Sequence, residues 1–488
     1  MTRIVMVAGT NQLSMLWSAA ADVPEVECIG VNNLYHTHEE ILKELERYSG
    51  AEWTIINSSM PVETASIARD LEDYISSYLT IVVSRDGSAE PLSSANRNVV
   101  DAVHGFVSYS GVENYRRMLR YLACGGGTDP EKVPMQGLVD PRDPETFYSS
   151  WEDYDRRFAD DNRPVSAIIT GRESWLAGRR GIDMAIAEAL EDNGIRPVVL
   201  FTRPKYDAPT KALNSSGSIY TLITDSGRSH VDLVISPGSS SFEDPRDADG
   251  KTIMPLAELQ RRMNVPMMNP MVLSNMDEET WRATDGLGQK LSSYIVLPEC
   301  SGLTDPFMIG TSYGMLGDFE ETPIPERVRR FARRARKRID LRRKANADKK
   351  IVFMLNISAC ASVEATIGLA VSLDTFESLV VILKEMKRRG YSVDVPGSAQ
   401  DIVDDILSHK SYAAHRWASP EDIEKAGGTV YSMGVEEYQK MFSELPADVR
   451  EAMTRTWGEA PGEGMVSNGK ILVTGRRYGN TIIAVQPK

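Results

Sequence analysis

Short β-rich runs alternate with helical stretches along this chain, and this alternation limits the possible fold more than any other feature of the sequence. In the first third, the runs RIVMVAG, AEWTIINSS and TIVVSR stand apart from helical sequence such as ETASIARDLEDYISSYL. An order of strand, helix and strand favours a layered α/β structure with a mainly parallel sheet. We therefore predict an α/β protein built from several Rossmann-like domains with mainly parallel sheets.

The alternation begins afresh twice, which predicts separate domains. After a segment rich in Pro, Asp and Glu, the strands SAIITGR, RPVVLFTR and VDLVISPG accompany the helix GIDMAIAEALEDNG, and the pattern continues through PMMNPM and SSYIVLPE. A third unit opens with KKIVFMLN and closes with ILVTGRRYGNTIIAVQPK, which reads as two strands joined at Tyr478-Gly479-Asn480. The predicted division is an N-terminal α/β domain at 1–127, a linker at 128–163, a second α/β domain at 164–325, a basic helical connector at 326–350 and a third α/β domain at 351–488.

The connector is predicted to be a basic amphipathic helix. From Glu326 to Lys350 the chain carries thirteen basic and three acidic residues, although its overall net charge is −14. Apolar residues recur within it at the helical spacing of three and four, at Val328, Phe331, Ala335 and Ile339. We interpret this segment as a solvated or interdomain helix, with docking of an acidic partner or of substrate carboxylates as the alternative.

Composition argues against several classes of protein. No apolar run approaches the ~20 residues that span a bilayer, and the first residues do not resemble a signal peptide, so we expect a cytoplasmic protein. The acidic net charge argues against a nucleic-acid-binding surface over the whole molecule. The four cysteines form no CxxC pair, and we interpret them as buried free thiols: Cys28, Cys124, Cys300 and Cys360.

Familiar catalytic motifs do not appear in complete form. GMVSNGK at 464–470 has the spacing of a P-loop, but Ile471 stands where the motif needs Ser or Thr, so we do not expect this chain to bind ATP. His415-Arg416-Trp417 suggests a polar loop that closes over a flat ligand. The histidines form no zinc motif and are interpreted as surface residues: His36, His38, His104, His230, His409 and His415.

A series of segments, in order along nearly the whole chain, resembles the large tetrapyrrole-binding subunit of the cobalt and magnesium chelatases. YSGVEN at 109–114 resembles the family's Y-x-G-G-x-E-N segment, and RPVSAIITGRESWLAGRRGIDMAIAEALEDNGIRPVVLF resembles the opening of its second domain. Further matches are Pro134 to Gly137, Val265-Pro266, Trp281 with Gly286-Leu287, VLPE at 296–299 with Gly302, LRRKANADKKIVFMLN, GLAVSLD at 368–374, WGEAPGE at 457–463 and YGNTIIAVQP at 478–487. The resemblance rests on the order of these segments, which is the same in this chain as in the family.

Two departures qualify what the resemblance implies. The family's N-Y-P-P loop is replaced by Asn356-Ile357-Ser358-Ala359-Cys360-Ala361, which lacks the proline pair. Family members are much longer and carry H-G-x-L-E-x-x-P-G, a motif implicated in metal insertion, which this sequence lacks. We therefore expect the catalytic residues on a C-terminal part, and we interpret this chain as the N-terminal half of a split or truncated large subunit that is inactive alone.

The resemblance implies a subunit of a metal chelatase, a ligase of cobalamin or chlorophyll biosynthesis. Its substrates would be a tetrapyrrole and a divalent metal, cobalt, magnesium or nickel. The implied partners are the C-terminal half of the large subunit and an AAA+ ATPase motor that uses ATP, and the implied architecture is a multi-domain cage. The alternatives are a non-catalytic tetrapyrrole carrier or regulator, and part of a haem dechelatase.

Metal insertion requires a distorted macrocycle, a base for the pyrrole protons and ligands that deliver the metal. Structural roles are the alternative reading for the candidate residues, with Asp374 as a helix cap and Trp457-Gly458 packing a turn. Glu299 is a weak candidate for a metal path, where packing or a turn hydrogen bond is the alternative. The candidate substrate-binding residues lie at or beside matching motifs in the third domain: Asn356, Asp374, Trp457, Arg476 and Asn480.

Overall fold

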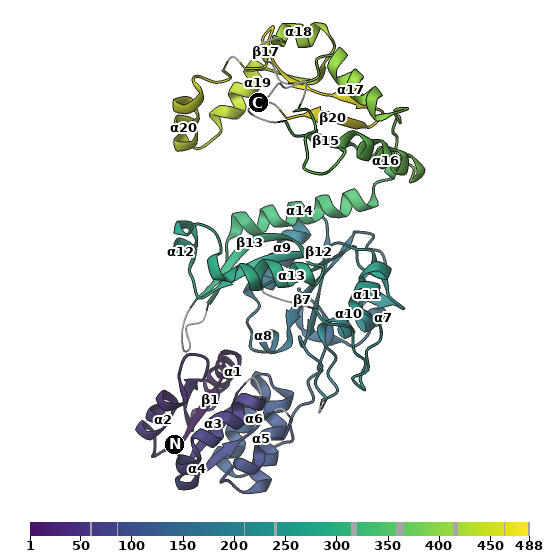
Figure 1. Cartoon of the computed structure of the whole chain (residues 1–488). Coiled ribbons are helices and arrows are strands. Elements are labelled where there is room, and N and C mark those ends of the chain that lie inside the picture. Colours follow the sequence, from purple (N-terminus) through teal and green to yellow (C-terminus); the bar gives the residue numbers. More distant parts are fainter. Residues whose placement is uncertain are drawn as a thin grey trace. The chain divides into compact units, whose positions relative to one another are not determined.

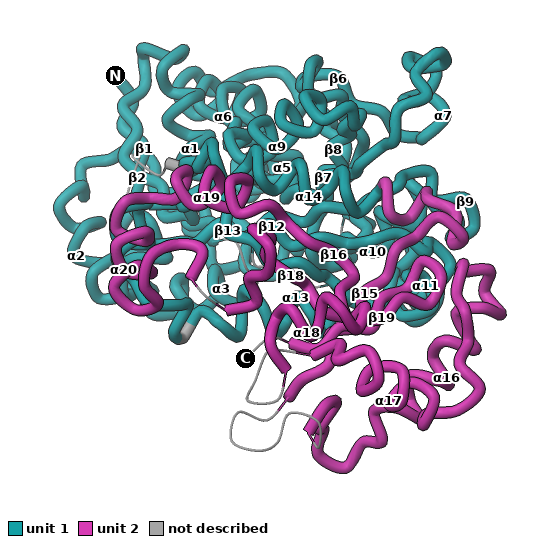
Figure 2. The backbone as a smooth tube through the Cα atoms, turned by 90° about the horizontal axis from the view of Figure 1, so that it is seen from above, with its two compact units in different colours: residues 1–339 teal, residues 340–488 magenta. Residues whose placement is uncertain are grey.

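A computed structural model describes the chain except for residues 59–60, 85, 209, 239–241, 314–319, 358–365, 413–417, 463 and 487–488. The chain forms two compact units, residues 1–339 and residues 340–488, coloured separately in Figure 2. Within the described residues, no helix has both the length and the apolar character needed to cross a membrane.

Unit 1 begins with a four-stranded parallel sheet in the order β2-β1-β3-β4. Figure 1 labels β1 among the helices α1 to α6 of this region. Every residue of β1 from Ile4 to Ala8 is fully buried, because helices cover both faces of the sheet. The sequence VECIGVN, which polar Glu27 interrupts, forms a strand that the sequence pattern did not predict. The strands are β1 (Thr2–Ala8), β2 (Val26–Asn32), β3 (Trp53–Asn57) and β4 (Thr80–Val82).

Six helices surround this first sheet among its described residues. Leu16 and Met118 join the core on one face, which α1, α5 and α6 cover, and Ile41 and Tyr74 join the core on the other, which α2, α3 and α4 cover. Gly125 ends α6 with a φ of +70°, a left-handed conformation that glycine adopts without a steric penalty. The helices are α1 (Thr10–Ala20), α2 (His38–Arg47), α3 (Pro61–Asp70), α4 (Glu72–Ser77), the 3-10 turn η1 (Glu90–Leu92), α5 (Arg97–Tyr109) and α6 (Val112–Cys124).

An eight-stranded sheet follows in unit 1, in the order β14-β13-β12-β11-β7-β8-β5-β6. The strands from β13 to β8 run parallel, and antiparallel strands flank them at both edges. The predicted α/β class with mainly parallel sheets is confirmed. The strands are β5 (Gly137–Asp140), β6 (Asp143–Tyr148), β7 (Val165–Gly171), β8 (Arg196–Thr202), β11 (Leu233–Ile235), β12 (Met267–Ser274), β13 (Thr304–Tyr313) and β14 (Glu320–Pro323), with a small separate pair of β9 (Thr224–Asp225) and β10 (Arg228–Ser229).

Helices cover both faces of the eight-stranded sheet. Helices α9 and α14 pack on one face, and α7, α10 and α11 pack on the other. The apolar seam predicted for the basic helix is confirmed, because its four residues are all buried, and α14 therefore belongs to the cover of this sheet. The helices are α7 (Trp151–Asp155), η2 (Arg156–Phe158), α8 (Arg172–Leu176), α9 (Gly181–Asp192), α10 (Ser215–Leu222), α11 (Leu256–Met263), α12 (Glu278–Ala283) and α14 (Pro325–Arg343).

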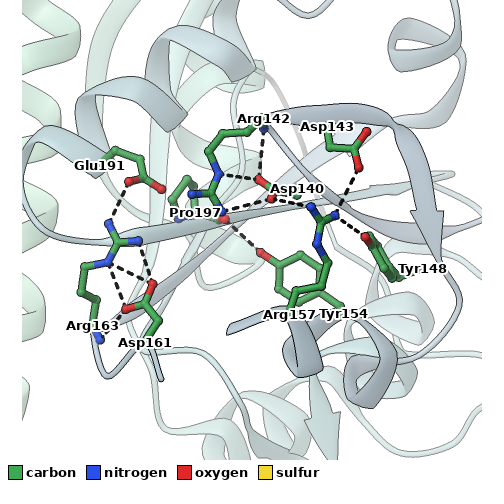
Figure 3. Close-up of polar contacts among 10 residues, drawn as sticks. All are labelled: Asp140, Arg142, Asp143, Tyr148, Tyr154, Arg157, Asp161, Arg163, Glu191 and Pro197. Atoms are coloured by element: carbon green, nitrogen blue, oxygen red, sulfur yellow. Dashed lines mark hydrogen bonds and ion pairs between the residues drawn. The ribbon is translucent and has the colours of Figure 1, made fainter. Parts of the chain in front are cut away.

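The segment 128–163, predicted as a linker, contributes β5, β6 and α7 to this domain instead. Figure 3 shows ion pairs that hold the β5–β6 hairpin. Arg142 donates to both carboxylate oxygens of Asp140 at 3.1 Å, and Arg157 donates to Asp143 at 3.2 Å. The sequence pattern missed the hairpin because β6 is a polar edge strand, without the apolar alternation of a half-buried strand.

The run SSYIVLPE, expected to continue the strand pattern, is helical. A short apolar run does not distinguish a strand from a helical segment. Tyr294 anchors these turns, because its hydroxyl accepts a hydrogen bond from the Ser274 N–H at 3.0 Å and its carbonyl accepts one from Asn269 at 2.7 Å. The segment consists of the 3-10 turn η3 (Gly288–Lys290), the π-helical turn η4 (Ser292–Val296) and α13 (Leu297–Cys300).

Unit 2 contains two three-stranded sheets, in the orders β15-β20-β19 and β16-β18-β17. Strands β15 and β20 run parallel, and the other pairs are antiparallel. The predicted pair of strands around Tyr478-Gly479-Asn480 is confirmed as the β19–β20 hairpin. The strands are β15 (Ile351–Leu355), β16 (Thr429–Gly434), β17 (Val466–Ser467), β18 (Lys470–Thr474), β19 (Arg476–Tyr478) and β20 (Thr481–Val485).

Helices α16 and α17 pack on one face of β15 and β20, where Leu383 and Ile402 share a core with Ile483. Ser419 caps α18, and Pro420 occupies the first turn of that helix, where its missing N–H costs no hydrogen bond. The helices of unit 2 are η5 (Asn346–Asp348), α16 (Thr375–Arg388), α17 (Ala399–Ser408), α18 (Pro420–Lys425), α19 (Val435–Ser443) and α20 (Ala447–Trp457).

Candidate functional site

A cavity opens at the carboxyl ends of the parallel strands in the eight-stranded sheet. The chain passes from β7 to β8 on one side and later forms β11 on the other side of β7. Such a reversal of strand order leaves a crevice outside the sheet, which is where open α/β sheets bind ligands. The cavity has a volume of about 390 Å³, and the ends of β7, β8 and β11 contribute to its wall.

Polar side chains line much of this cavity. The Oγ atom of Ser236 is buried and has no hydrogen-bond partner within the described part of the chain. Buried hydroxyls are normally paired, so Ser236 offers an unused donor and acceptor to a ligand. The cavity is lined by the hydroxyl-bearing residues Thr170, Ser174, Thr202, Ser215 and Ser236 and by the ionisable residues Arg179, Asp183 and Glu321.

Asp183 is the most perturbed acid in the cavity. It lies in the first turn of α9 and is only 6% exposed. Burial raises the pKa of Asp183 to about 7, against a smaller lowering by a hydrogen bond with Thr170, and the nearby Glu321 raises it further. A carboxyl group with a pKa near neutrality exchanges its proton within the physiological range.

Glu321 and Arg179 form an ion pair in the same cavity wall, with 3.0 Å between Arg179 Nη2 and Glu321 Oε1. Burial raises the pKa of Glu321, and the guanidinium of Arg179 opposes that increase. Arg179 also donates a hydrogen bond to Asn11 in α1, whose amide donates to Ser174. The described residues of the cavity wall therefore include one cation and two carboxyl groups, and their net charge depends on the protonation of Asp183.

A buried arginine connects three of the family-like motifs beside this cavity. Arg172 is 1% exposed and donates to the main-chain oxygens of Tyr109 at 2.6 Å and Pro134 at 2.8 Å. It also pairs with Glu173, and Glu173 pairs with the buried Arg203 at 2.7 Å. The motifs YSGVEN, Pro134 to Gly137 and ITGRESW thus meet at one polar junction between the two sheets of unit 1. Sequence reasoning did not identify Arg172 or Asp183, since an ionisable residue within a motif gives no sign of its burial.

The structure places the predicted substrate-binding residues in different parts of unit 2. Asn356 follows the end of β15, whereas Asn480 precedes β20 and lies beside the start of β15. The two asparagines flank opposite ends of a five-residue strand pair, six residue steps or about 20 Å apart at ~3.3 Å per residue. Asp374 caps α16 by accepting a hydrogen bond from the Glu377 N–H at 3.0 Å. Asn480 therefore lies apart from Asn356 within unit 2, and Asp374 has a structural role as a helix cap.

Arg476 lies in a separate polar cluster with Asp405 and His409. Its Nε donates to Asp405 at 2.9 Å, and the hydroxyl of Tyr478 donates to the same carboxylate at 2.9 Å. Burial raises the pKa of Asp405, but the hydrogen bonds from Arg476 and Tyr478 outweigh it, so the net shift is downward. Trp457 ends α20 and is 80% exposed, so its ring is open to solvent.

The remaining predicted features have ordinary structural surroundings. Glu299 is exposed in α13. GMVSNGK forms the β17–β18 hairpin, with positive φ at Asn468 and Gly469 as in a type I′ turn. The loop residues 358–361 and His415-Arg416-Trp417 lie outside the described residues. Within the described ranges, no group of three or more His, Cys, Asp or Glu residues is placed to hold a metal ion.

The cysteine prediction is wrong for two of the three described thiols. Cys124 and Cys300 are exposed, because each lies at the end of a helix on the surface, while Cys28 is partly buried and burial raises its pKa to about 12. Cys360 lies outside the described residues. The five described histidines are partly buried, and each has a neighbour: His36 with Asn32, His38 with Asp70, His104 with Glu90, His230 stacked on Trp151, and His409 with Asp405.

Mainly parallel sheets covered by helices on both faces, with a crevice at the switch point of the larger sheet, define an open-sheet α/β protein. The CobN/magnesium chelatase family model matches residues 104–488. The chain belongs to this family, which confirms the resemblance of its motifs.

Similar proteins include two curated relatives. The chain is 27% identical over 478 residues to the uncharacterized protein MJ1441 of Methanocaldococcus jannaschii, covering 92% of this chain and 38% of that protein. It is 25% identical over 432 residues to the aerobic cobaltochelatase subunit CobN of Pseudomonas aeruginosa, covering 84% of this chain and 32% of that subunit. The chain thus spans about a third of the length of these relatives.

A solved structure shares the fold. The catalytic subunit of cobaltochelatase from Mycobacterium tuberculosis aligns with a TM-score of 0.64 and 22% identity, over 100% of this chain and 39% of that chain.

Proposed function

We propose that this chain holds a tetrapyrrole in the cytoplasm as the N-terminal portion of a metal-chelatase large subunit. In this role it acts with the C-terminal part of that subunit and with an AAA+ ATPase motor that uses ATP. The observation that carries the proposal is the family match, because residues 104–488 include the cavity of unit 1 and the whole of unit 2. Cobalt, magnesium and nickel are the candidate metals.

The chain's own contribution is to grip and orient the macrocycle. Trp457 is the strongest of the proposed contacts, because an exposed indole offers an apolar face on which a planar ring can stack. Arg476 is already held by Asp405 and by the carbonyl of Gly427 at 2.9 Å, so its guanidinium is fixed in direction and presents a cation beside the ligand. Asn356 is exposed and supplies an amide at the end of β15.

The other proposed residues have structural partners that they would need to keep. Asn480 donates to the carbonyl of Ala347 at 2.8 Å, and Asp374 caps α16. We retain both as proposed substrate neighbours and Glu299 as the proposed residue near a metal path. Metal ligands and the base that removes the pyrrole protons are assigned to the C-terminal part.

A pigment titration tests the proposal. Protoporphyrin IX is added to the purified chain, and quenching of tryptophan emission together with the shift of the pigment absorbance gives the Kd. Trp457→Ala removes one stacking partner, worth ~0.5–1.5 kcal/mol, and weakens binding roughly two- to twelvefold. Tyr431→Ala, which also removes an exposed aromatic side chain in unit 2, is the matched control and leaves the Kd unchanged.

Metal insertion is assayed with the chain alone and with its two partners, ATP and each candidate metal. Activity only in the complete mixture supports the chelatase assignment. Tight pigment binding without insertion in any mixture indicates the carrier or regulator instead, and release of metal from haem indicates a dechelatase. Absence of pigment binding with and without partners refutes the proposal.

A further inference from the structure

Strand β15 lies at the edge of its sheet in unit 2. Its pairing with β20 is parallel, and the N–H of Ile351 donates to Asn480 while the carbonyl of Leu355 accepts from Gln486. Hydrogen bonds in a parallel ladder alternate along each strand, so Val352 and Met354 direct their N–H and C=O groups away from β20. Within the described part of the chain, no backbone hydrogen bond reaches these outward groups.

The side chains of the same two residues are apolar and open to solvent. Val352 and Met354 are each 57% exposed, whereas Leu355 and Ile483 are buried against α16 and α17. Parallel sheets are normally covered on both faces, and a flat apolar edge strand is a ready template for pairing with another segment. Among the described residues, no strand pairs with the outer edge of β15, and the side chains of Val352 and Met354 stay exposed.

Further exposed apolar side chains follow near the end of the strand. The N–H of Gly368 donates to the carbonyl of Asn356 at 2.8 Å, which places the following residues beside the end of β15. Three apolar side chains follow at alternate positions, and all are exposed: Leu369, Val371 and Leu373. Exposed large apolar side chains that gather in one part of a protein mark interaction surfaces.

We propose that the edge of β15 receives a β-strand from the C-terminal part of the chelatase large subunit. This inference rests on the proposed function. The occupant is the part of the relatives that this chain does not span, since the match covers only 38% of the Methanocaldococcus relative and 32% of the Pseudomonas subunit. A strand added there satisfies the outward groups of Val352 and Met354, and its alternate side chains cover theirs.

The test mixes this chain with the C-terminal chelatase part of the same organism, produced as a separate polypeptide. Association is measured by isothermal titration calorimetry. The double variant Val352→Lys/Met354→Lys places two charges on the open face and weakens association at least about tenfold, because charged side chains on an edge strand block pairing. The control is Tyr431→Lys/Val473→Lys, which changes two exposed side chains on the other sheet of unit 2 and leaves association unchanged.

Hydrogen–deuterium exchange gives an independent readout. The amides of Val352 and Met354 exchange rapidly in the chain alone and slowly in the complex. Circular dichroism melting of the double variant alone matches that of the wild type, because both substituted side chains are already exposed. Three results would each refute the proposed docking surface on β15. The wild-type chain does not associate with the C-terminal part, or the β15 variant and the control variant associate with it equally tightly. Alternatively, dimerisation of this chain alone protects the β15 amides from exchange.

A parallel pigment titration separates this inference from the proposed function. If the β15 double variant no longer associates with the C-terminal part but still binds protoporphyrin IX, the result supports both the docking surface and the proposed function. Association through β15 without any pigment binding refutes the proposed function and leaves the docking surface standing. If the chain binds the pigment but the β15 double variant associates as tightly as the wild type, the docking surface is refuted and the proposed function is not.

Discussion

Replacing Asp183 with Asn tests whether the cavity of unit 1 contains a destabilising buried acid. The pKa of this carboxyl rises from 3.8 to about 7 on folding, chiefly through burial. A shift of about three units corresponds to roughly 4 kcal/mol at ~1.36 kcal/mol per unit. An asparagine has nearly the same shape, and its carbonyl oxygen accepts the hydrogen bond from Thr170.

The sign of the effect follows from proton binding in the two states. Below about pH 4 Asp183 is protonated in both the folded and unfolded chain, and it contributes no pH dependence. Between about pH 4 and pH 7 the unfolded chain releases this proton while the folded chain keeps it, so the free energy of unfolding falls as the pH rises. Above pH 7 the wild type bears the full destabilisation that comes from the raised pKa of Asp183, and the asparagine variant avoids this destabilisation.

The assay compares urea unfolding of the wild type and Asp183→Asn at pH 5 and pH 8, followed by hydrogen exchange of peptides from β7 and α9 to isolate unit 1 from unit 2. The stability advantage of the variant grows by roughly 3 kcal/mol between the two pH values. Asp192→Asn, an exposed change at the other end of α9, is the control and shows no comparable growth. A difference between Asp183→Asn and wild type that is the same at both pH values refutes the reasoning.

Three further substitutions test the junction, the basic helix and the helix cap. Arg172→Met leaves the buried carbonyl oxygens of Tyr109 and Pro134 without their donor and removes one of the two cations beside Glu173, and we expect a loss of about 3–5 kcal/mol, measured by urea unfolding, with faster proteolysis between the two sheets of unit 1 as a second readout. Phe331→Ala removes a fully buried ring between α14 and its sheet and costs about 3–5 kcal/mol, whereas Arg333→Ala on the exposed side of the same helix stays within about 0.5 kcal/mol. Asp374→Ala costs about 1 kcal/mol by removing the cap of α16, and Asp374→Ser restores the cap. If pigment affinity falls in Asp374→Ser while stability is kept, the carboxylate contacts the ligand; if affinity follows stability in both variants, Asp374 is only a cap.

Strand and helix order could be predicted from the sequence because the hydrophobic pattern reports which faces are buried. The seam of α14 illustrates this, since Val328, Phe331 and Ile339 recur at helical spacing and are all buried. The β5–β6 hairpin could not be predicted, because a polar edge strand carries no such pattern. SSYIVLPE shows the converse, since a short apolar run fits either a strand or a helical turn.

The candidate residues show the same division. The sequence alone determined the family, through motifs whose order is preserved along the chain, and it determined the α/β class through the spacing of apolar residues. Only the tertiary structure separated Asn356 from Asn480 at opposite ends of one strand pair and brought Thr170, Asp183 and Glu321 together around one cavity. Burial and proximity arise from contacts between segments far apart in the chain, and no local pattern encodes the desolvation that makes Asp183 unusual.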